Sequence, residues 1–237
     1  MSEVALLRIE GGKANAMTAE LLDTIEQHID DFERGPARAA VITGYDKYFS
    51  AGLALPALID LDRPAMGAFI ERFARAMLRV FRCEKPIVAA INGHAIAGGC
   101  VLALMCDYRV IVNDDGVRIG LNETQLGIGL PAVVLEPLRA QVPATSLTSL
   151  AINGALVTPQ QALALGLVHE VGGSAHAIAA RLAAVPPVAA AQVKRALRRP
   201  VLEAIAQYPG DTDAWLDTWF SPHAQERLRA AVAKMTR

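Results

Sequence analysis

Residues 87–123 read IVAAINGHAIAGGCVLALMCDYRVIVNDDGVRIGLNE, and this order of apolar, glycine and acidic residues predicts a strand, a loop and a buried helix. The β-branched run Ile87–Ile91 has the length of a buried strand, and Asn92-Gly93 ends it. Gly98-Gly99 then opens a short helix that is apolar on nearly every side from Val101 to Met105. Glycines at a helix start leave backbone N–H groups uncovered at the positive end of the dipole, which favours an anion or a developing oxyanion.

The same stretch ends in a carboxylate, Glu123, with apolar neighbours in the sequence. These neighbours are Ile119, Leu121, Leu126 and Ile128. Their desolvating effect would raise the pKa of the Glu123 carboxyl towards the range that is useful for proton transfer. A surface position or a helix-capping role is the alternative for a lone glutamate. An oxyanion donor and one carboxylate together indicate proton transfer next to a carbonyl.

A second strand–loop–glycine unit precedes the first. The apolar run Ala39–Thr43 predicts a strand, and the loop 45–53 that follows it ends in small residues and Gly52. If the two loops were adjacent in space, each would present one N–H group to a single oxygen. Two donors are the minimum for an oxyanion hole, in which one donor is worth about 3 kcal/mol. The residues alone leave open whether the loops converge.

Composition excludes several classes of function. The 237 residues are 53% hydrophobic and 20% charged, with a formal net charge of −1, so there is no broad electrostatic reason to expect a nucleic-acid or membrane partner. No apolar run is long enough for a membrane span, and the first residues do not have the pattern of a signal peptide. We expect a cytoplasmic location. Cys83, Cys100 and Cys106 have no metal-ligand spacing, which favours buried free thiols and no metal site.

Other motifs of known chemistry are missing from the sequence. It has no GxSxG, HExxH or P-loop pattern, and Gly127-Ile128-Gly129 lacks the rest of a dinucleotide fingerprint. His94 is interpreted as a loop histidine that bonds to the backbone, with a catalytic base as the alternative. The basic run 195–199 is interpreted as a solvated helix face, with a phosphate contact as the alternative.

The remaining patterns predict an α/β protein with a helical C-terminal region. Val4–Ile9 predicts a first strand, and Thr18 is placed as the N-cap of the helix that follows it. Residues 108–112 and 117–121 are predicted to pair as two strands around a turn at 113–116, and 167–171 is predicted as a short strand. We expect a core over residues 1–172 and a helical tail over residues 173–237, a kind of segment that covers an active site or mediates assembly.

Four short motifs together resemble the crotonase (enoyl-CoA hydratase/isomerase) superfamily. In order along the chain they are Phe49-Ser50-Ala51-Gly52-Leu53, Ala97-Gly98-Gly99-Cys100, Cys106-Asp107 and Gly120-Leu121-Asn122-Glu123. The resemblance implies an α/β fold with a crotonase-like spiral of ββα units and a C-terminal helical region. It also implies an acyl-CoA thioester as substrate and a homotrimer or a dimer of trimers as the assembly.

The resemblance assigns roles to residues. It implies that the thioester carbonyl accepts hydrogen bonds from the backbone N–H groups of Leu53 and Gly98, and that Glu123 is the catalytic acid and base. The implied substrate-binding residues are Lys13, Ala14, Asn15, Ala51, Gly52, Leu53, Ala54, Leu55, Gly98, Gly99 and Val101. No metal is implied and no separate cofactor either, because coenzyme A is part of the substrate.

Val101 departs from the hydratase pattern, which has a glutamate directly after Gly-Gly-Cys. Valine neither orients nor deprotonates water, whereas one carboxylate suffices to move a double bond from 3-enoyl-CoA to trans-2-enoyl-CoA. The string Leu121 to Ile128, LNETQLGI, is similar to the mitochondrial-type Δ3,Δ2-enoyl-CoA isomerases of this superfamily. An isomerase of fatty acid β-oxidation is therefore the leading hypothesis.

The sequence leaves open two alternatives to an isomerase. One is another acyl-CoA reaction, hydration or thioester hydrolysis, with water activated by Glu123 alone or by Asp62 or His94. The other is a catalytically idle acyl-CoA-binding protein that has this fold.

Overall fold

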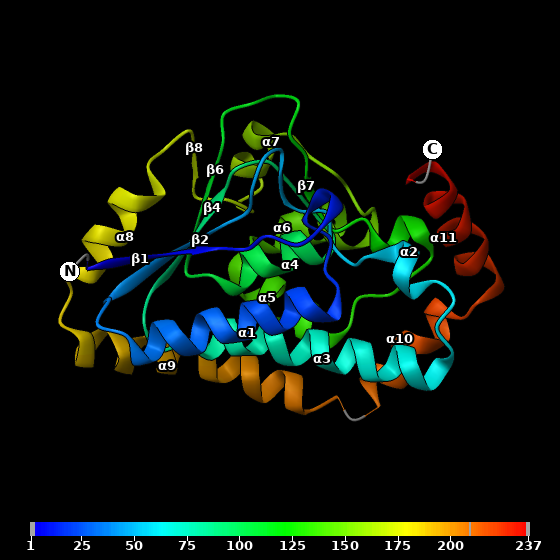
Figure 1. Ribbon diagram of the computed structural model, residues 1–237, viewed down its shortest axis with the longest axis horizontal. Coiled ribbons are helices and arrows are strands. Elements are labelled where there is room, and N and C mark those ends of the chain that lie inside the picture. Colours follow the sequence, from blue (N-terminus) through cyan, green and yellow to red (C-terminus); the bar gives the residue numbers. More distant parts are fainter. Residues whose placement is uncertain (1–2, 209, 236–237) are drawn as a thin grey trace.

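The computed structural model describes residues 3–208 and 210–235, and its described strands form two parallel sheets wrapped by helices (Figure 1). The large sheet has the strand order β1-β2-β4-β6-β8, with β1 (Val4–Arg8), β2 (Ala39–Thr43), β4 (Ile87–Ile91), β6 (Tyr108–Ile111) and β8 (Glu170–Val171). The small sheet has the order β3-β5-β7, with β3 (Tyr48–Ser50), β5 (His94–Ile96) and β7 (Ile119–Gly120).

Three successive pairs of strands each supply one strand to the large sheet and the next strand to the small sheet. β2, β4 and β6 are neighbours in the large sheet, and β3, β5 and β7, which directly follow them in the chain, are neighbours in the small one. The β4 strand is buried at four of its five residues because a parallel sheet is covered on both faces. This repeated arrangement is the ββα spiral that was expected from the sequence, and it brings the ends of β3, β5 and β7 to one edge.

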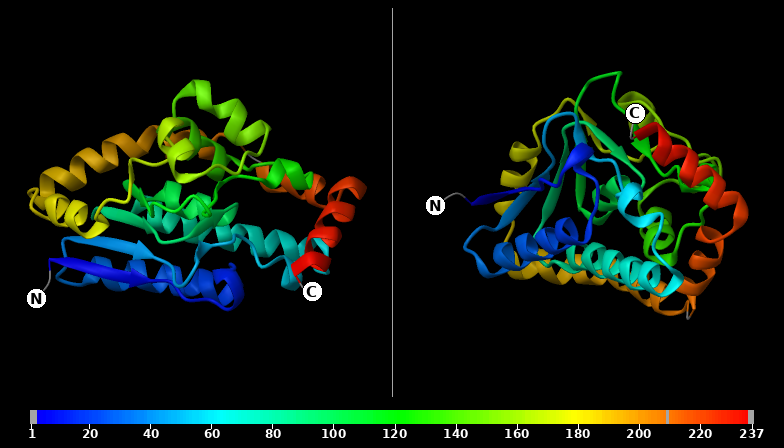
Figure 2. Two further views of the ribbon diagram at one scale, coloured as in Figure 1. Left: turned by 90° about the horizontal axis from the view of Figure 1, so that it is seen from above. Right: turned by 45° about the vertical axis from the view of Figure 1, so that its right-hand side comes forward.

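Helices make up most of the rest of the chain. The α-helices are α1 (Ala19–Arg34), α2 (Leu55–Leu58), α3 (Arg63–Arg82), α4 (Gly98–Met105), α5 (Ala132–Gln141), α6 (Ala144–Leu147), α7 (Pro159–Ala164), α8 (Ala175–Ala183), α9 (Pro187–Ala206), α10 (Asp211–Trp219) and α11 (Pro222–Met235). Two 3-10 helices, η1 (Lys13–Asn15) and η2 (Glu123–Leu126), and one π-helix, η3 (Thr148–Ile152), complete the set. α1 and α3 run side by side along one face in both views of the ribbon (Figures 1 and 2).

Local sequence signals account for several helix boundaries. Thr18 caps α1 as predicted, since its Oγ1 accepts a hydrogen bond from the Leu21 N–H at 3.3 Å. Asp62 caps α3 in the same way through the Ala65 N–H at 2.9 Å. All eight residues of α4 are buried, so the prediction of a helix that is apolar on nearly every side is confirmed.

Two strand predictions were wrong in part. Residues 108–112 and 117–121 do not pair with each other, because β6 joins the large sheet beside β4 and β7 joins the small sheet beside β5. The turn between them does form, with the Gly116 N–H donating to Asp114 Oδ1 at 2.8 Å, but it redirects the chain from one sheet to the other. The predicted strand at 167–171 is limited to Glu170–Val171.

Asp107 ties the C-terminal helices to the core. Its Oδ2 accepts hydrogen bonds from the Ile87 N–H at 2.8 Å and from Lys194 Nζ at 2.6 Å, and its Oδ1 accepts one from Arg198 at 2.8 Å. Lys194 and Arg198 side chains are only 11% and 12% exposed, so these charges are poorly hydrated. The carboxylate therefore compensates two poorly hydrated cations of α9 and accepts a hydrogen bond from one backbone N–H group of the sheet.

We expect Asp107→Ala to lower the free energy of unfolding by about 2 kcal/mol, because it leaves two poorly hydrated cations without their counter-ion. Urea denaturation measures this loss. Asp31→Ala is the matched control, since the Arg34–Asp31 pair is more than half exposed and such pairs contribute about 0.5 kcal/mol or less. Equal losses in the two variants would contradict the anchoring role of Asp107.

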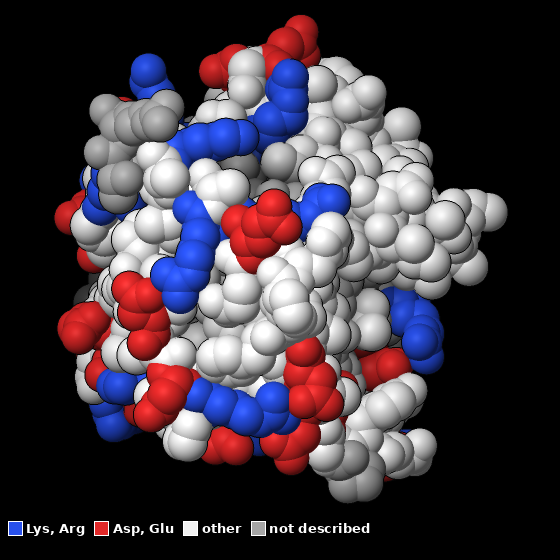
Figure 3. All heavy atoms as spheres, turned by 90° about the vertical axis from the view of Figure 1, so that its right-hand side faces the viewer, with Lys and Arg blue, Asp and Glu red and all other residues white. Residues whose placement is uncertain are grey.

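The surface of the described residues has no strongly one-signed face in the view of Figure 3. Lysine and arginine side chains alternate there with aspartate and glutamate side chains, beside a large uncharged area. None of the described helices combines the length and apolar character that a bilayer crossing requires. All three cysteines are free and buried, as predicted, and burial raises the pKa of each thiol.

Candidate active site

A cavity of about 920 Å³ lies at the edge where the strands of the small sheet end. Its wall is mainly apolar, and its polar groups are backbone atoms and a few side chains. Its lining includes Lys13, Ala14, Ala51, Leu53, Ala54, Leu55, Ala97, Gly98, Val101, Glu123, Leu126, Ile128, Trp215, Trp219 and Met235. A mainly apolar cavity with few polar groups is the usual form of a small-molecule site.

The two glycine-containing loops converge at this cavity. β3 and β5 are parallel neighbours, with Ser50 opposite Ala95, so the loops that follow them leave the same edge of the sheet. Gly52 packs so closely on the second loop that an added Cβ would lie 2.9 Å from the amide nitrogen of Gly98. The adjacency that the sequence left open is therefore present.

The backbone N–H groups of Leu53 and Gly98 have no acceptor among the described residues. Met17 pairs with the first loop on either side of Leu53, because its N–H donates to the Gly52 carbonyl at 2.7 Å and its own carbonyl accepts from the Ala54 N–H at 3.1 Å. Gly98 is the first residue of α4, where N–H groups have no partner within the helix. Two unpaired N–H donors on adjacent loops can donate to an oxygen atom of a bound ligand, which is the chemistry that an oxyanion hole requires.

Glu123 follows β7, the third strand of the small sheet, and lies in η2. Its backbone is fixed because its carbonyl accepts the Ile128 N–H at 3.0 Å. The side chain lines the cavity, and its Oε2 is buried without a hydrogen-bond partner among the described residues. This burial raises the pKa of the Glu123 carboxyl from 4.5 to about 7, which suits a group that both takes and returns a proton.

Val101 occupies the first turn of α4 and is fully buried against the same cavity. Its N–H donates to the Ala97 carbonyl at 3.0 Å, which fixes its place in the helix. Glu123 is the one carboxylate among the residues that line the cavity in the described part of the chain. The described wall of the cavity therefore contains a single carboxylate.

Eight of the eleven predicted substrate-binding residues line the cavity. They are Lys13, Ala14, Ala51, Leu53, Ala54, Leu55, Gly98 and Val101. The others, Asn15, Gly52 and Gly99, lie behind the wall and support it. Asn15 is buried and joins two segments, donating from Nδ2 to the carbonyls of Ile9 and Phe49 at 3.1 and 2.7 Å. A Cβ on Gly99 would lie 2.1 Å from the Ser50 carbonyl oxygen, so only glycine fits between α4 and β3.

The C-terminal helices complete the cavity with residues that sequence reasoning did not assign to the site. Trp215 and Trp219 of α10 stack with their ring centroids 5.3 Å apart, and both line the wall. α11 contacts α2 and η2, and it lies beside α2 in Figures 1 and 2. Lys13 Nζ donates to the Met235 carbonyl at 2.8 Å and so links η1 to the end of α11. Trp215 and Trp219 are four residues apart, the spacing at which side chains meet on one face of a helix, and this is the sequence signal that could have identified the pair.

The other groups considered for water activation lie elsewhere. Asp62 is the N-cap of α3 and does not line the cavity. His94 is also outside the lining, and its Nδ1 accepts the Arg118 N–H at 3.1 Å, as predicted for a histidine satisfied by the backbone. Among the described residues, no three His, Cys, Asp or Glu side chains are grouped so as to hold a metal ion.

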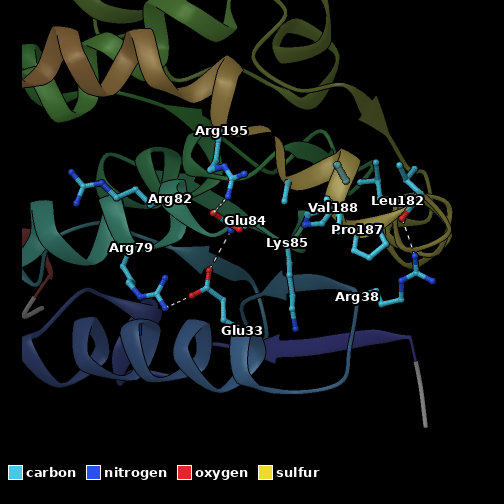
Figure 4. A pocket seen from close by; sticks show the side chains of 14 residues that line it. Glu33, Arg38, Arg79, Arg82, Glu84, Lys85, Leu182, Pro187, Val188 and Arg195 are labelled. Atoms are coloured by element: carbon cyan, nitrogen blue, oxygen red, sulfur yellow. Dashed lines mark hydrogen bonds and ion pairs between the residues drawn. The ribbon is translucent and has the colours of Figure 1, made fainter. Parts of the chain in front are cut away.

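A second cavity, of about 690 Å³, lies between α1, α3 and the start of α9 (Figure 4). Its charged groups largely neutralise one another, since Arg79 pairs with Glu33 at 2.5 Å and Arg195 pairs with Glu84 at 2.7 Å. Lys85 Nζ donates to the carbonyls at the end of α1, including that of Gly35 at 2.8 Å. These ion pairs and hydrogen bonds hold neighbouring segments together. The described charged groups of this cavity therefore do not form a site like that of Glu123.

The repeated ββα units, with their two parallel sheets and helical C-terminal region, place this chain in the crotonase fold class. A family profile described as Enoyl-CoA hydratase/isomerase matches residues 1–229, and the chain belongs to that family. The solved structure of human mitochondrial delta3-delta2-enoyl-CoA isomerase superposes with a TM-score of 0.90 at 26% identity, covering 99% of this chain and 94% of that one.

Curated relatives bear names of more than one activity. The human mitochondrial enoyl-CoA delta isomerase 1 is 31% identical over 170 residues, which are 71% of this chain and 56% of that protein. The 2,3-dehydroadipyl-CoA hydratase of Escherichia coli is 33% identical over 191 residues, 78% of this chain and 72% of that protein. The match to a putative enoyl-CoA hydratase of Thermus thermophilus, at 36% identity, covers 67% of this chain and 63% of that protein. The chain thus spans less than two thirds of the length of two of these relatives.

Proposed function

We propose that this protein is a Δ3,Δ2-enoyl-CoA isomerase that moves the double bond of a 3-enoyl-CoA to the trans-2 position. The observation that carries this proposal is the single carboxylate of the cavity, Glu123, with Val101 where a second carboxylate would serve hydration. The mitochondrial isomerases among the relatives and solved structures support the same activity.

Glu123 would act as both base and acid. Its carboxylate takes a proton from C2 of the 3-enoyl thioester, and the negative charge moves onto the thioester oxygen as a dienolate. The N–H groups of Leu53 and Gly98 donate to that oxygen. The protonated carboxyl then returns the proton to C4, which restores the carboxylate and leaves the double bond between C2 and C3.

Apolar surroundings favour this shuttle over hydration. Leu126, Ile128 and Trp219 line the cavity with Glu123, and the described lining contains no second carboxylate that could hold or deprotonate a water molecule. Hydration is the second candidate, because several relatives are named hydratases. The cytoplasmic location, the trimeric assembly and the absence of a separate cofactor stay predictions from the sequence.

Product analysis of 3-enoyl-CoA incubated in D2O tests the proposal. Isomerisation gives 2-enoyl-CoA without 3-hydroxyacyl-CoA or free coenzyme A. A hydratase would accumulate 3-hydroxyacyl-CoA from 2-enoyl-CoA, and a thioesterase would release coenzyme A. Folded protein that binds acyl-CoA and leaves 3-enoyl-CoA unchanged would refute the isomerase and favour an idle binding protein.

The pH dependence follows from the pKa of Glu123. The base must be deprotonated to take the C2 proton, so kcat/KM should be constant above about pH 7 and fall about tenfold per pH unit below it. An unshifted glutamate would keep kcat/KM constant down to about pH 5. Initial rates between pH 5 and 9, with circular dichroism to confirm folding at each pH, distinguish the two profiles.

A further inference from the structure

Ala97 has a backbone conformation that L-residues rarely adopt. Its φ of 52° and ψ of −121° are those of the first central position of a type II′ turn, which glycine normally occupies. Ala14 also has a positive φ, 59°, but its ψ of 20° lies near the left-handed helical region that non-glycine residues visit. Ala97 is thus strained at the residue that directly precedes the Gly98 donor.

Hydrogen bonds on both sides hold Ala97 in this conformation. Its N–H donates to the Gly120 carbonyl of β7 at 2.8 Å, and its carbonyl accepts the Val101 N–H of α4 at 3.0 Å. The peptide that follows Ala97 carries the Gly98 N–H, so the orientation of that donor depends on the φ and ψ angles of Ala97.

The methyl group of Ala97 also contacts the loop that carries the other donor. A Cβ built on Gly52 would lie 2.9 Å from the Cβ of Ala97 and 2.8 Å from the Ile96 carbonyl oxygen. The methyl therefore packs directly on the Gly52 backbone, one residue before Leu53. It acts as a spacer between the two donor loops.

We propose that Ala97 is a positioning residue, whose strained backbone and methyl group set the orientation and spacing of the Leu53 and Gly98 N–H groups. This inference rests on the proposed function, because it assigns the two N–H groups to an oxyanion. Glycine at position 97 removes the strain but also removes the spacer and gives the Gly98 peptide additional orientations. Activity should then fall without a loss of stability.

Ala97→Gly tests this separation of activity from stability. We expect a melting temperature that is unchanged or higher by about 2–4 °C. We also expect a kcat for 3-enoyl-CoA that is lower by about tenfold, with KM within twofold of the wild-type value. A residue with only a structural role would not lower kcat while stability is kept.

Asp46→Gly is the matched control. Asp46 also has a positive φ, 48°, but it lies in the loop between β2 and β3 and does not line the cavity. Its carbonyl accepts the Asn92 side chain at 3.1 Å, a bond that glycine keeps. Because aspartate is tolerated at positive φ, this variant should keep a melting temperature close to that of the wild type and retain the wild-type kcat.

Binding of two coenzyme A thioesters gives a readout that needs no turnover. Acetoacetyl-CoA forms an enolate with negative charge on the thioester oxygen, whereas butyryl-CoA stays neutral. Ala97→Gly should lose about tenfold in affinity for acetoacetyl-CoA at pH 9 and keep its affinity for butyryl-CoA. Equal losses for both ligands, or an unchanged kcat, would overturn the role of Ala97. A wild-type protein without isomerase activity would refute the proposed function, while the ratio of the two affinities would still test Ala97.

Discussion

Glu123→Gln should lower kcat for isomerisation by about 10³-fold or more while leaving KM within a fewfold of the wild-type value. The amide has nearly the same shape as the carboxyl group but takes no proton at neutral pH, so both proton transfers lose their catalyst. Acyl-CoA binding should persist, because the cavity wall is otherwise unchanged. Steady-state rates with 3-enoyl-CoA and a binding titration with butyryl-CoA measure the two effects separately.

The stability of the same variant provides an internal control. The pKa of Glu123 is raised from 4.5 to about 7 in the folded protein, so ionisation costs the folded state about 3 kcal/mol relative to the unfolded chain. That cost is absent below pH 4.5, grows as the pH rises to about 7 and is constant above it. Glutamine carries no such cost, and Glu123→Gln should therefore unfold at higher urea concentration than wild type at pH 8 but not at pH 4.5.

Two results would contradict this assignment. A Glu123→Gln protein with wild-type kcat would exclude Glu123 as the proton shuttle. A stability difference that is the same at pH 4.5 and pH 8 would show that the carboxyl group is hydrated, and the raised pKa would then not explain the chemistry. A loss of activity together with the pH-dependent gain in stability is the combination expected for a functional group kept at a cost to folding.

Strong local signals in the sequence predicted much of the fold. The apolar run at Ile87–Ile91 and the glycine-led helix that follows it form β4 and α4, because an almost fully buried strand and a fully buried helix both need continuous apolar sequence. The error at residues 108–121 has a different cause. Two short apolar segments joined by a turn have the pattern of a hairpin, and only the pairing with β4 and β5 shows that they belong to separate sheets.

Predicting the site likewise required knowledge of contacts between residues that are far apart in the chain. Glu123 was a candidate from its apolar neighbours, but the approach of Gly52 to Gly98 depends on the pairing of β3 with β5, more than 40 residues apart in the chain. Trp219 reaches the wall through the packing of the C-terminal helices, and the sequence of these helices does not show which of them contacts the cavity. The residues alone did not show which backbone N–H groups face one another. The resemblance to a known family identified them as those of Leu53 and Gly98.

Gly52→Ala should lower kcat by about 10²- to 10³-fold, because it separates the two donor loops. The added Cβ would lie 2.8 Å from the Ile96 carbonyl oxygen and 2.9 Å from the Gly98 nitrogen. These are backbone atoms of β5 and α4, which are held by strand pairing and by burial, so the loop of Gly52 has to move instead. Displacing one donor of an oxyanion hole costs about 3–4 kcal/mol of transition-state stabilisation, which corresponds to this loss of rate.

The positive φ of Gly52, 84°, adds backbone strain that must be separated from the steric effect. Gly210 has nearly the same φ, 80°, and no atom of the described residues would lie within 4 Å of an added Cβ there. Gly210→Ala should therefore lose stability through strain alone and keep its kcat. Thermal melts and steady-state rates of both variants make the comparison. If the two alanine variants retained equal kcat values, the close approach of Gly52 to Gly98 would not set the donor geometry. If only Gly52→Ala lost activity, and lost affinity for acetoacetyl-CoA but not for butyryl-CoA, the contact between the loops would be the feature that holds the negative charge.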